Sequence, residues 1–191
     1  VVTDPADHDW ATSLPTLHGQ AWKRLERGVA DRRAPGRHPT LATVDDRGRP
    51  QARTVVLRAA DRTDACLRVY TDRHSDKVEE LQANPLAGLH FWDPGAHLQI
   101  RLQGDVRISA GESVRSVWER LSDHARDCYG RDPAPGNMLD DALAYRKWPE
   151  PDAFAVLEIR LQEMDILHLG RHHRRARYER SDGWAGHWIV P

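Results

Sequence analysis

The sequence has little cysteine and no long apolar run. It contains 191 residues but only two cysteines, Cys66 and Cys128, which argues against a disulfide framework or a cysteine-based metal site. No segment approaches the roughly 20 apolar residues that cross a bilayer, and the mean hydropathy is −0.71. The first residues, Val1–Asp9, lack the basic start and apolar stretch of a signal peptide. We therefore expect a soluble protein of a reducing cytoplasm.

The chain also lacks net charge and is poor in lysine. It carries 28 Lys and Arg against 29 Asp and Glu, a formal charge of −1, which argues against a general nucleic-acid or membrane-surface binder. Only Lys23, Lys77 and Lys147 are lysines, so 25 of the 28 basic residues are arginines. Arginine suits carboxylate and phosphate recognition, although we attribute most of these residues to a compositional bias of the source genome. The question is which few arginines bind a ligand.

The hydrophobic pattern changes along the chain from a helical to a strand period. Apolar residues spaced by three and four predict a helix within 8–33, beginning near Thr16 after Pro15 or made of two pieces. Alternating segments bounded by turn residues then predict strands at 40–44, 51–58, 66–71, 86–92, 97–108, 154–161, 164–169, 174–179 and 184–190. Further helices are predicted at 76–84, 112–125 and 139–148.

This order of elements favours one fold class. Strands and helices do not alternate regularly, so a parallel sheet is not expected, and an antiparallel β-barrel with peripheral helices fits best. The length suits one domain covering residues 1–191. We expect a helical arm at 1–37 and a barrel with inserted helices at 38–191.

The most informative segment for chemistry runs from Arg53 to Lys77. Ser75 and Lys77 begin the predicted helix 76–84, where unpaired backbone N–H groups and the helix dipole favour an anion. Arg53 and Arg58 would complete a clamp for a phosphate dianion. The alternative is that Ser75 only caps the helix and the charges are solvated. Arg53 and Arg58 are an odd number of residues apart, so both reach one ligand only if the strand bends or ends there, or if they serve different parts of a site.

Four segments, in this order, resemble the pyridoxamine 5′-phosphate oxidase family. They are Asp45–Arg58, Tyr70–Lys77, Glu80–Pro85 and Gln99–Gly104. The resemblance covers about residues 38–110, extends to the closing stretch 164–191, and fits best an uncharacterised branch of oxidase-like proteins. It implies a split β-barrel that binds FMN, typically as a homodimer with FMN in the dimer cleft.

The same resemblance implies a set of FMN-binding residues. They are Arg53, Val55, Val56, Leu57, Arg58, Tyr70, Thr71, Ser75, Lys77, Gln99 and Arg177. Within this set, Arg53, Ser75 and Lys77 are expected on the phosphate, and the others on the flavin ring system or beside it. Asp76 replaces the arginine of the family's Ser-Arg-Lys phosphate motif, and Leu167 stands where a tryptophan is common.

The substrate motif of the oxidase is altered. His173-Arg174-Arg175 stands in place of its Arg-Leu-His, and its Gln-Ser cofactor pair has no clear counterpart near Pro135-Gly136. We therefore expect an FMN-dependent oxidoreductase whose substrate and electron donor the sequence does not identify. Its catalytic residues also stay unknown, because the flavin itself carries out the redox chemistry and no side-chain nucleophile is required.

Other function classes stay open at this stage. The same barrel would serve a non-catalytic flavin or haem carrier, or a stress-response binding protein. The arginines of 171–177 suggest a nucleic-acid-binding barrel, but one short segment in a neutral chain favours a charged strand edge. His168, His172 and His173 suggest a metal site, yet His173 faces away from the other two on a strand and no acidic or cysteine ligand accompanies them. We expect neither nucleic acid nor metal.

Overall fold

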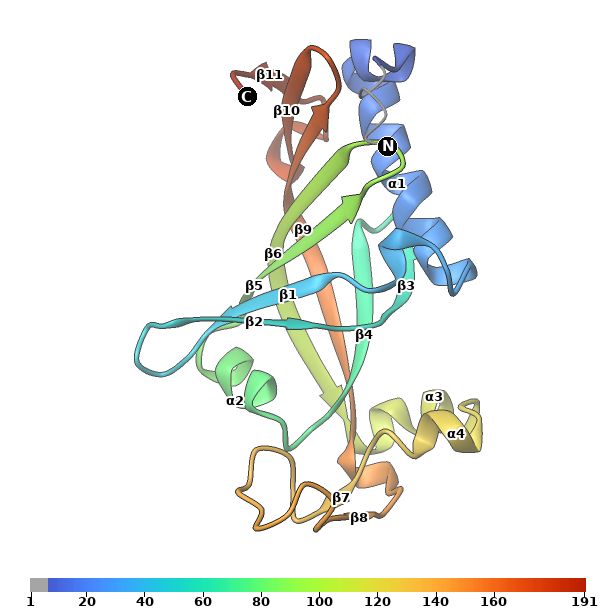
Figure 1. Cartoon of the computed structure of the whole chain (residues 1–191), viewed down its shortest axis with the longest axis vertical. Coiled ribbons are helices and arrows are strands. Elements are labelled where there is room, and N and C mark those ends of the chain that lie inside the picture. Colours follow the sequence, from blue (N-terminus) through green and yellow to red (C-terminus); the bar gives the residue numbers. More distant parts are fainter. Residues whose placement is uncertain (1–6) are drawn as a thin grey trace.

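The N-terminal helix covers one flank of a curled antiparallel sheet in the computed structural model, which describes residues 7–191 (Figure 1). The first six residues of the expected arm 1–37, which include most of the segment inspected for a signal peptide, lie outside the described residues. The helices are α1 (Leu14–Ala30), α2 (Asp76–Ala83), α3 (Arg115–Glu119) and α4 (Asp123–Arg126). Short 3-10 turns are η1 (Asp9–Thr12), η2 (Pro35–Arg37), η3 (Gly111–Val114), η4 (Pro151–Ala153) and η5 (Arg180–Asp182).

The strands pair in the order β11-β10-β9-β6-β5-β1-β2, and β4 joins β3 to β9. They are β1 (Thr40–Val44), β2 (Pro50–Thr54), β3 (Leu57–Asp61), β4 (Cys66–Asp72), β5 (Leu86–Asp93), β6 (Leu98–Ala110), β7 (Arg131–Asp132), β8 (Arg146–Lys147), β9 (Phe154–Leu169), β10 (His173–Glu179) and β11 (His187–Ile189). Every pairing is antiparallel. The predicted class, an antiparallel β-fold with peripheral helices, is confirmed.

The long strand β9 makes the sheet curl. Its first half pairs with β4 on one side and β6 on the other, whereas its second half pairs with β10 and β6. The sequence predicts two strands here, at 154–161 and 164–169, and the structure joins them into one. The β6–β9 register shifts between Gln103 and Gly104, so Gln162 is left over as a bulge that bends the ladder without ending it.

The predicted strand 51–58 is wrong, because the chain changes partner within it. β2 pairs with β1, whereas β3 pairs with β4. Val55 and Val56 connect the two strands, and the Val55 N–H donates to the carbonyl of Pro39 at 2.9 Å. This break places Arg53 and Arg58 on different strands, which removes the difficulty of their odd spacing.

Four other predicted elements also differ. α1 begins at Leu14 rather than near Thr16, because Pro15 fits its first turn and the Ser13 hydroxyl accepts the Thr16 N–H. The predicted helix 112–125 is divided where Ser122 caps a new helix through the Ala125 N–H. Residues 139–148 form no helix and contribute only β8, and the predicted strand 184–190 shortens to β11.

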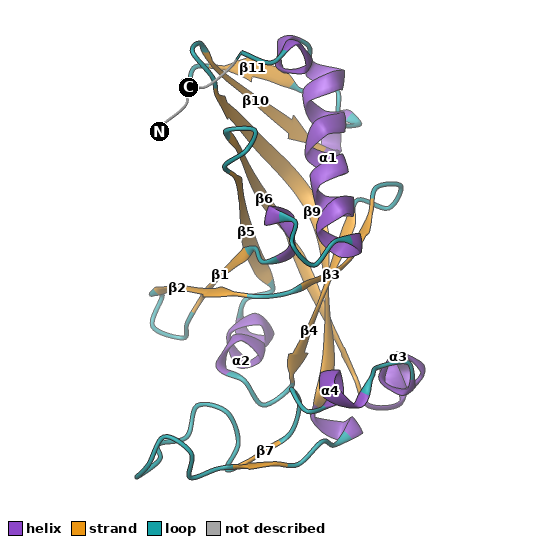
Figure 2. Cartoon of the chain, turned by 45° about the vertical axis from the view of Figure 1, so that its right-hand side comes forward, coloured by secondary structure: helices purple, strands orange, loops and turns teal. Residues whose placement is uncertain are grey.

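Figure 2 shows α1 along the sheet, α2 below the β1–β2 hairpin, and α3 and α4 at the far end. Two clusters of buried apolar side chains hold the helices in this arrangement. The main cluster includes Leu17, Trp22 and Leu25 of α1 and the inward side chains of the sheet. A second cluster joins α3 to the start of β9 through Trp118 and Phe154. Within residues 7–191, no helix is both long and apolar enough to span a membrane.

Candidate functional site

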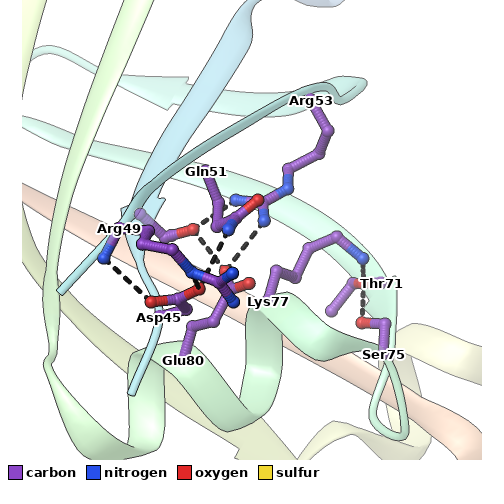
Figure 3. Close-up of polar contacts among 9 residues, drawn as sticks. Asp45, Arg49, Gln51, Arg53, Thr71, Ser75, Lys77 and Glu80 are labelled. Atoms are coloured by element: carbon purple, nitrogen blue, oxygen red, sulfur yellow. Dashed lines mark hydrogen bonds and ion pairs between the residues drawn. The ribbon is translucent and has the colours of Figure 1, made fainter. Parts of the chain in front are cut away.

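A polar network joins the β1–β2 hairpin to α2. Arg53 on β2 donates through Nη2 to Oε2 of Glu80 at 2.8 Å and through Nη1 to the hydroxyl of Thr43, which itself donates to the same Glu80 oxygen. The Glu80 side chain is only 10% exposed and Arg53 23%. Figure 3 shows Arg53 reaching from its strand toward the helix that carries Glu80 and Lys77.

A second part of the network surrounds the start of α2. The Lys77 ammonium donates to the hydroxyl of Thr71 at 3.1 Å, and this hydroxyl lies 3.2 Å from that of Ser75 (Figure 3). Ser75 occupies the N-cap position, but its hydroxyl donates to the carbonyl of Asp72 at 2.7 Å and caps no helical N–H. The predicted side-chain cap is therefore absent, so the serine hydroxyl does not occupy the N–H groups that begin this helix.

The electrostatics of this region favour an added anion. Burial lowers the pKa of Lys77, and the positive charge of Arg53 lowers it further, against the opposing effect of Asp76, Asp72 and Glu80. Two cations held together in a half-buried site are stabilised when an anion joins them. The N-terminus of α2 adds its own partial positive charge at the same place.

Arg58 lies beyond this network, against aromatic rings. Its guanidinium carbon is 5.6 Å from the ring centre of Tyr70, and its buried Nε has no hydrogen-bond partner in the described structure. Burial raises the pKa of the neighbouring Tyr129, and the Arg58 charge opposes that rise. A buried guanidinium N–H without an acceptor costs free energy, so the Nε of Arg58 favours an added acceptor, although the side chain also hydrogen-bonds Tyr129.

The segment between Arg53 and Arg58 is well anchored. Val55 is 8% exposed, Leu57 is fully buried and Val56 is half-buried. The carbonyl of Leu57 accepts a hydrogen bond from Arg37 of η2 at 3.2 Å. The side chains of Val55 and Leu57 therefore pack into the core beside the two arginines, and the Leu57 carbonyl has a partner within the chain.

The sheet faces of Arg53, Gln99 and Arg177 follow from the strand registers. Arg53 lies opposite Leu41 of β1, Leu41 lies opposite Leu89 of β5, and Leu89 lies opposite Leu102 of β6. These three leucines are buried. Opposite residues of an antiparallel sheet share a face, so Arg53 projects from the core-facing side.

Gln99 is an odd number of residues from Leu102 and projects from the other face of the sheet. Its Oε1 lies 3.4 Å from Nε2 of His90. Arg177 lies opposite Asp165 of β9, which lies opposite Arg101 of β6. Arg101 is two residues from Gln99 on the same strand, so Arg177 and Gln99 share a face of the sheet. One chain thus brings Arg53, Thr71, Ser75 and Lys77 together, but not Gln99 or Arg177.

Sequence reasoning missed Glu80 and Thr43. Glu80 follows Lys77 by three residues and so shares its face of α2, a signal that the sequence contained. Thr43 is contributed by β1, and only the pairing of β1 with β2 brings it to Arg53. No local pattern distinguishes it from the other threonines of the chain.

The histidines of the C-terminal hairpin have other roles. His168 is fully buried beside the rings of His8 and Trp10, and its pKa falls to about 4, chiefly through burial. His172 Nδ1 lies 2.8 Å from a carboxylate oxygen of Asp7. Within residues 7–191, no group of three or more His, Cys, Asp or Glu side chains is arranged to hold a metal ion.

Comparison with known families gives one match. Residues 19–110 match the family model described as pyridoxamine 5′-phosphate oxidase, FMN-binding domain. A pyridoxine/pyridoxamine 5′-phosphate oxidase of Microcystis aeruginosa is 33% identical over 184 residues, which cover 87% of this chain and 85% of that protein. The oxidase of the same name from Acinetobacter baumannii is 29% identical and is covered to 77%.

Solved structures of similar shape agree with this match. A pyridoxamine 5′-phosphate oxidase-related, FMN-binding protein of Nostoc punctiforme has a TM-score of 0.74 and 28% identity, covering 95% of this chain and all of the other. PhzG from Burkholderia lata, solved in complex with tetrahydrophenazine-1-carboxylic acid, has a TM-score of 0.73 over 98% of this chain and all of the other. Its identity of 23% shows the shared fold alone.

The residues present fit the cofactor of this family. FMN carries a phosphate dianion and a polar ring system, and the chain offers Arg53 and Lys77 beside two hydroxyls, together with the unpartnered Nε of Arg58. Fold and sequence relatives agree: the chain belongs to the pyridoxamine 5′-phosphate oxidase family and carries its FMN-binding domain.

Proposed function

We propose that this protein is an FMN-dependent oxidoreductase whose substrate differs from that of the relatives named after pyridoxamine 5′-phosphate. The observation that carries the proposal is the position of Lys77, half-buried near Arg53 with a hydroxyl as its hydrogen-bond partner. Such a cation is stabilised by a phosphate and has no evident purpose in packing. When bound, FMN supplies hydride or electron transfer.

The chain's own residues hold and orient the cofactor. Arg53 and Lys77 bind the phosphate together with the hydroxyls of Ser75 and Thr71. Segment 55–57 places its backbone beside the ring system, and Arg58 offers its free Nε there. Gln99 and Arg177 act on the ring from the opposite face of the sheet, and Tyr70 supports Arg58 through the cation–π contact.

The altered substrate motif supports a different substrate. Arg175 is bound in a bidentate pair to Asp165, with Nε to Oδ1 at 3.0 Å and Nη2 to Oδ2 at 2.7 Å. Arg174 lies 3.3 Å from a carboxylate oxygen of Asp7. The bidentate pair therefore occupies two donors of Arg175 and the Asp7 contact one donor of Arg174, which leaves fewer donors for an anionic substrate in this arrangement.

The opposite orientations of the ligands imply a homodimer. Arg53 projects from the core-facing side of the sheet, whereas Gln99 and Arg177 project from the other side. A flavin that contacts all three therefore needs a second copy of the chain to supply one set. The outer face also carries a groove of about 510 Å³, floored in part by Gly88 and Ala42, where small side chains allow close approach of a partner.

Absorbance of the purified protein and titration with FMN test this proposal first. We expect flavin bands and saturable FMN binding, and then reduction of the bound flavin by NADH, NADPH or an amine substrate. Failure to bind added FMN would contradict the proposal. FMN binding without reduction by any donor would instead indicate a flavin carrier, and a Soret band would indicate haem binding.

A further inference from the structure

Glu80 has an unusual position for an acidic residue. It lies within the network that receives the cofactor phosphate, yet it brings a negative charge to that place. Its Oε2 accepts hydrogen bonds from both Arg53 and Thr43, and its side chain is 10% exposed. No other carboxylate among the described residues forms an ion pair with Arg53.

We infer that Glu80 is a positioning residue that sets the affinity of the phosphate site, since it fixes the Arg53 side chain while its charge opposes the phosphate. The inference rests on the proposed role of Arg53 in binding the phosphate of FMN. It assigns Glu80 two effects of opposite sign, and substitutions of different chemistry separate them.

The positioning effect follows from the hydrogen bonds of Arg53. A guanidinium has five N–H donors, of which Glu80 and Thr43 occupy one each. The remaining donors are free for a phosphate, and they are held in one orientation because Glu80 and Thr43 are themselves bonded to each other. Preorganisation of this kind improves affinity by removing the ordering cost of a long side chain.

The opposing effect follows from charge. Asp72, Asp76 and Glu80 all act on Lys77, and of the three only Glu80 also binds Arg53. A like charge within several ångströms of a phosphate in a half-buried site weakens binding about tenfold. The site as built therefore holds FMN less tightly than its two cations alone would, which favours a cofactor that exchanges with solution.

Three variants separate the two effects. Glu80→Gln keeps an acceptor for Arg53 but removes the charge, whereas Glu80→Ala removes both. Glu79→Gln on the exposed face of the same helix removes the same charge without touching the network, and serves as the matched control. The measurement is flavin fluorescence quenching, titrated with FMN and with riboflavin, which lacks the phosphate.

We expect Glu80→Gln to bind FMN about tenfold more tightly and to retain more flavin on desalting. Glu80→Ala should bind FMN at least roughly fivefold more weakly than Glu80→Gln, because Arg53 loses its fixed orientation. Riboflavin affinity should stay within about twofold in both, and Glu79→Gln should leave both affinities unchanged. Equal FMN affinity in Glu80→Gln and the wild type, or an equal shift with riboflavin, overturns the inference.

Thr43→Val provides an independent measurement should the Glu80 variants not fold. It removes one anchor of Arg53 without changing charge or volume, so FMN should bind a few times more weakly and riboflavin as before. Unchanged FMN affinity in this variant counts against the positioning effect. The proposed phosphate site fails separately, and recognisably, if the wild type binds FMN and riboflavin equally well.

Discussion

Two groups of cationic side chains in this molecule differ in how directly carboxylates pair with them. The phosphate cluster (Arg53, Thr71, Ser75 and Lys77) includes two cations and has one carboxylate hydrogen-bonded to it, that of Glu80. The outer-face cluster (Arg101, Asp165, Arg175 and Arg177) gathers three arginines around Asp165, at 3.8, 2.7 and 3.9 Å from Oδ2, and Glu163 lies 3.5 Å from Arg177.

The comparison shows that arginine by itself does not mark a ligand site. Asp165 is 2% exposed and forms a bidentate pair with Arg175, which gives this pair a structural role in joining β9 and β10. Arg177 is 3.9 Å from Asp165, and its Nε has no hydrogen-bond partner among the described residues. In the phosphate cluster each cation has a hydroxyl partner, and only Arg53 is also paired with a carboxylate, so several donors stay available. The carboxylate partners, rather than the number of arginines, distinguish the two.

The largest expected effect comes from removing both positively charged side chains of the phosphate cluster. Arg53→Met combined with Lys77→Met should weaken FMN binding roughly 1000-fold, since each charge-assisted hydrogen bond contributes about 2 kcal/mol. Isothermal titration with FMN measures this loss, and riboflavin should bind much as before. An unchanged FMN affinity would show that the phosphate lies elsewhere. Lys23→Met combined with Arg32→Met, both at exposed positions, controls for the loss of two positive charges.

The matching change in the outer-face cluster should act on stability instead. Asp165→Asn leaves three arginines without their shared carboxylate, and breaking a buried ion pair of this kind costs about 3 kcal/mol. Urea unfolding of the apo-protein checks this value. The more exposed Glu163→Gln should cost less than about 1 kcal/mol. Equal losses in the two variants would contradict a central role for Asp165.

A third prediction concerns pH and His168, three residues beyond Asp165 on β9. The pKa of buried His168 is about 4, against 6.5 when unfolded, so the unfolded chain takes up the proton first as pH falls below 6.5. Stability should therefore decline between pH 6.5 and 4, by up to about 3 kcal/mol for this group. The pKa of His18 is lowered similarly, to about 4, and adds to the decline.

His168→Leu should make this decline shallower, because an apolar side chain of similar size binds no proton. Thermal unfolding followed from pH 7 to pH 4 measures the slope. His124→Gln at an exposed position should leave the slope as in the wild type. A slope that is identical in His168→Leu and the wild type would show that His168 does not account for it.

The smallest expected effect is an alkaline loss of FMN affinity. Burial and the Arg53 charge lower the pKa of Lys77 below its ordinary value of 10.5, and only the charged ammonium attracts the phosphate. FMN affinity should therefore fall as pH rises through that lowered pKa, by up to about tenfold. Lys77→Arg should abolish the fall, since arginine stays charged. Riboflavin titrations over the same pH range correct for ionisation of the flavin itself.

Much of the fold followed from local patterns. The strands at 40–44, 66–71, 86–92 and 174–179 and the helix at 76–84 were predictable, because each has a clear period and ends at turn residues or at Pro85. The two wrong strand predictions in the middle of the chain share one cause. The strand at 51–58 breaks, and the two strands at 154–169 merge, where a distant partner strand decides the pairing.

The same division applies to the site. The sequence by itself predicted Arg53, Ser75 and Lys77 as parts of one anion site, because a helix N-terminus, a serine, a lysine and an upstream arginine are features with a known affinity for anions. It also placed Arg58 in that clamp, which the structure sets apart against Tyr70, and it did not place Thr71 there. Only the tertiary structure decided that Glu80 and Thr43 hold Arg53, that Asp165 occupies Arg175, and that Gln99 and Arg177 project from the sheet face opposite to Arg53. These contacts depend on strand register and on residues distant in the sequence, which no local period encodes.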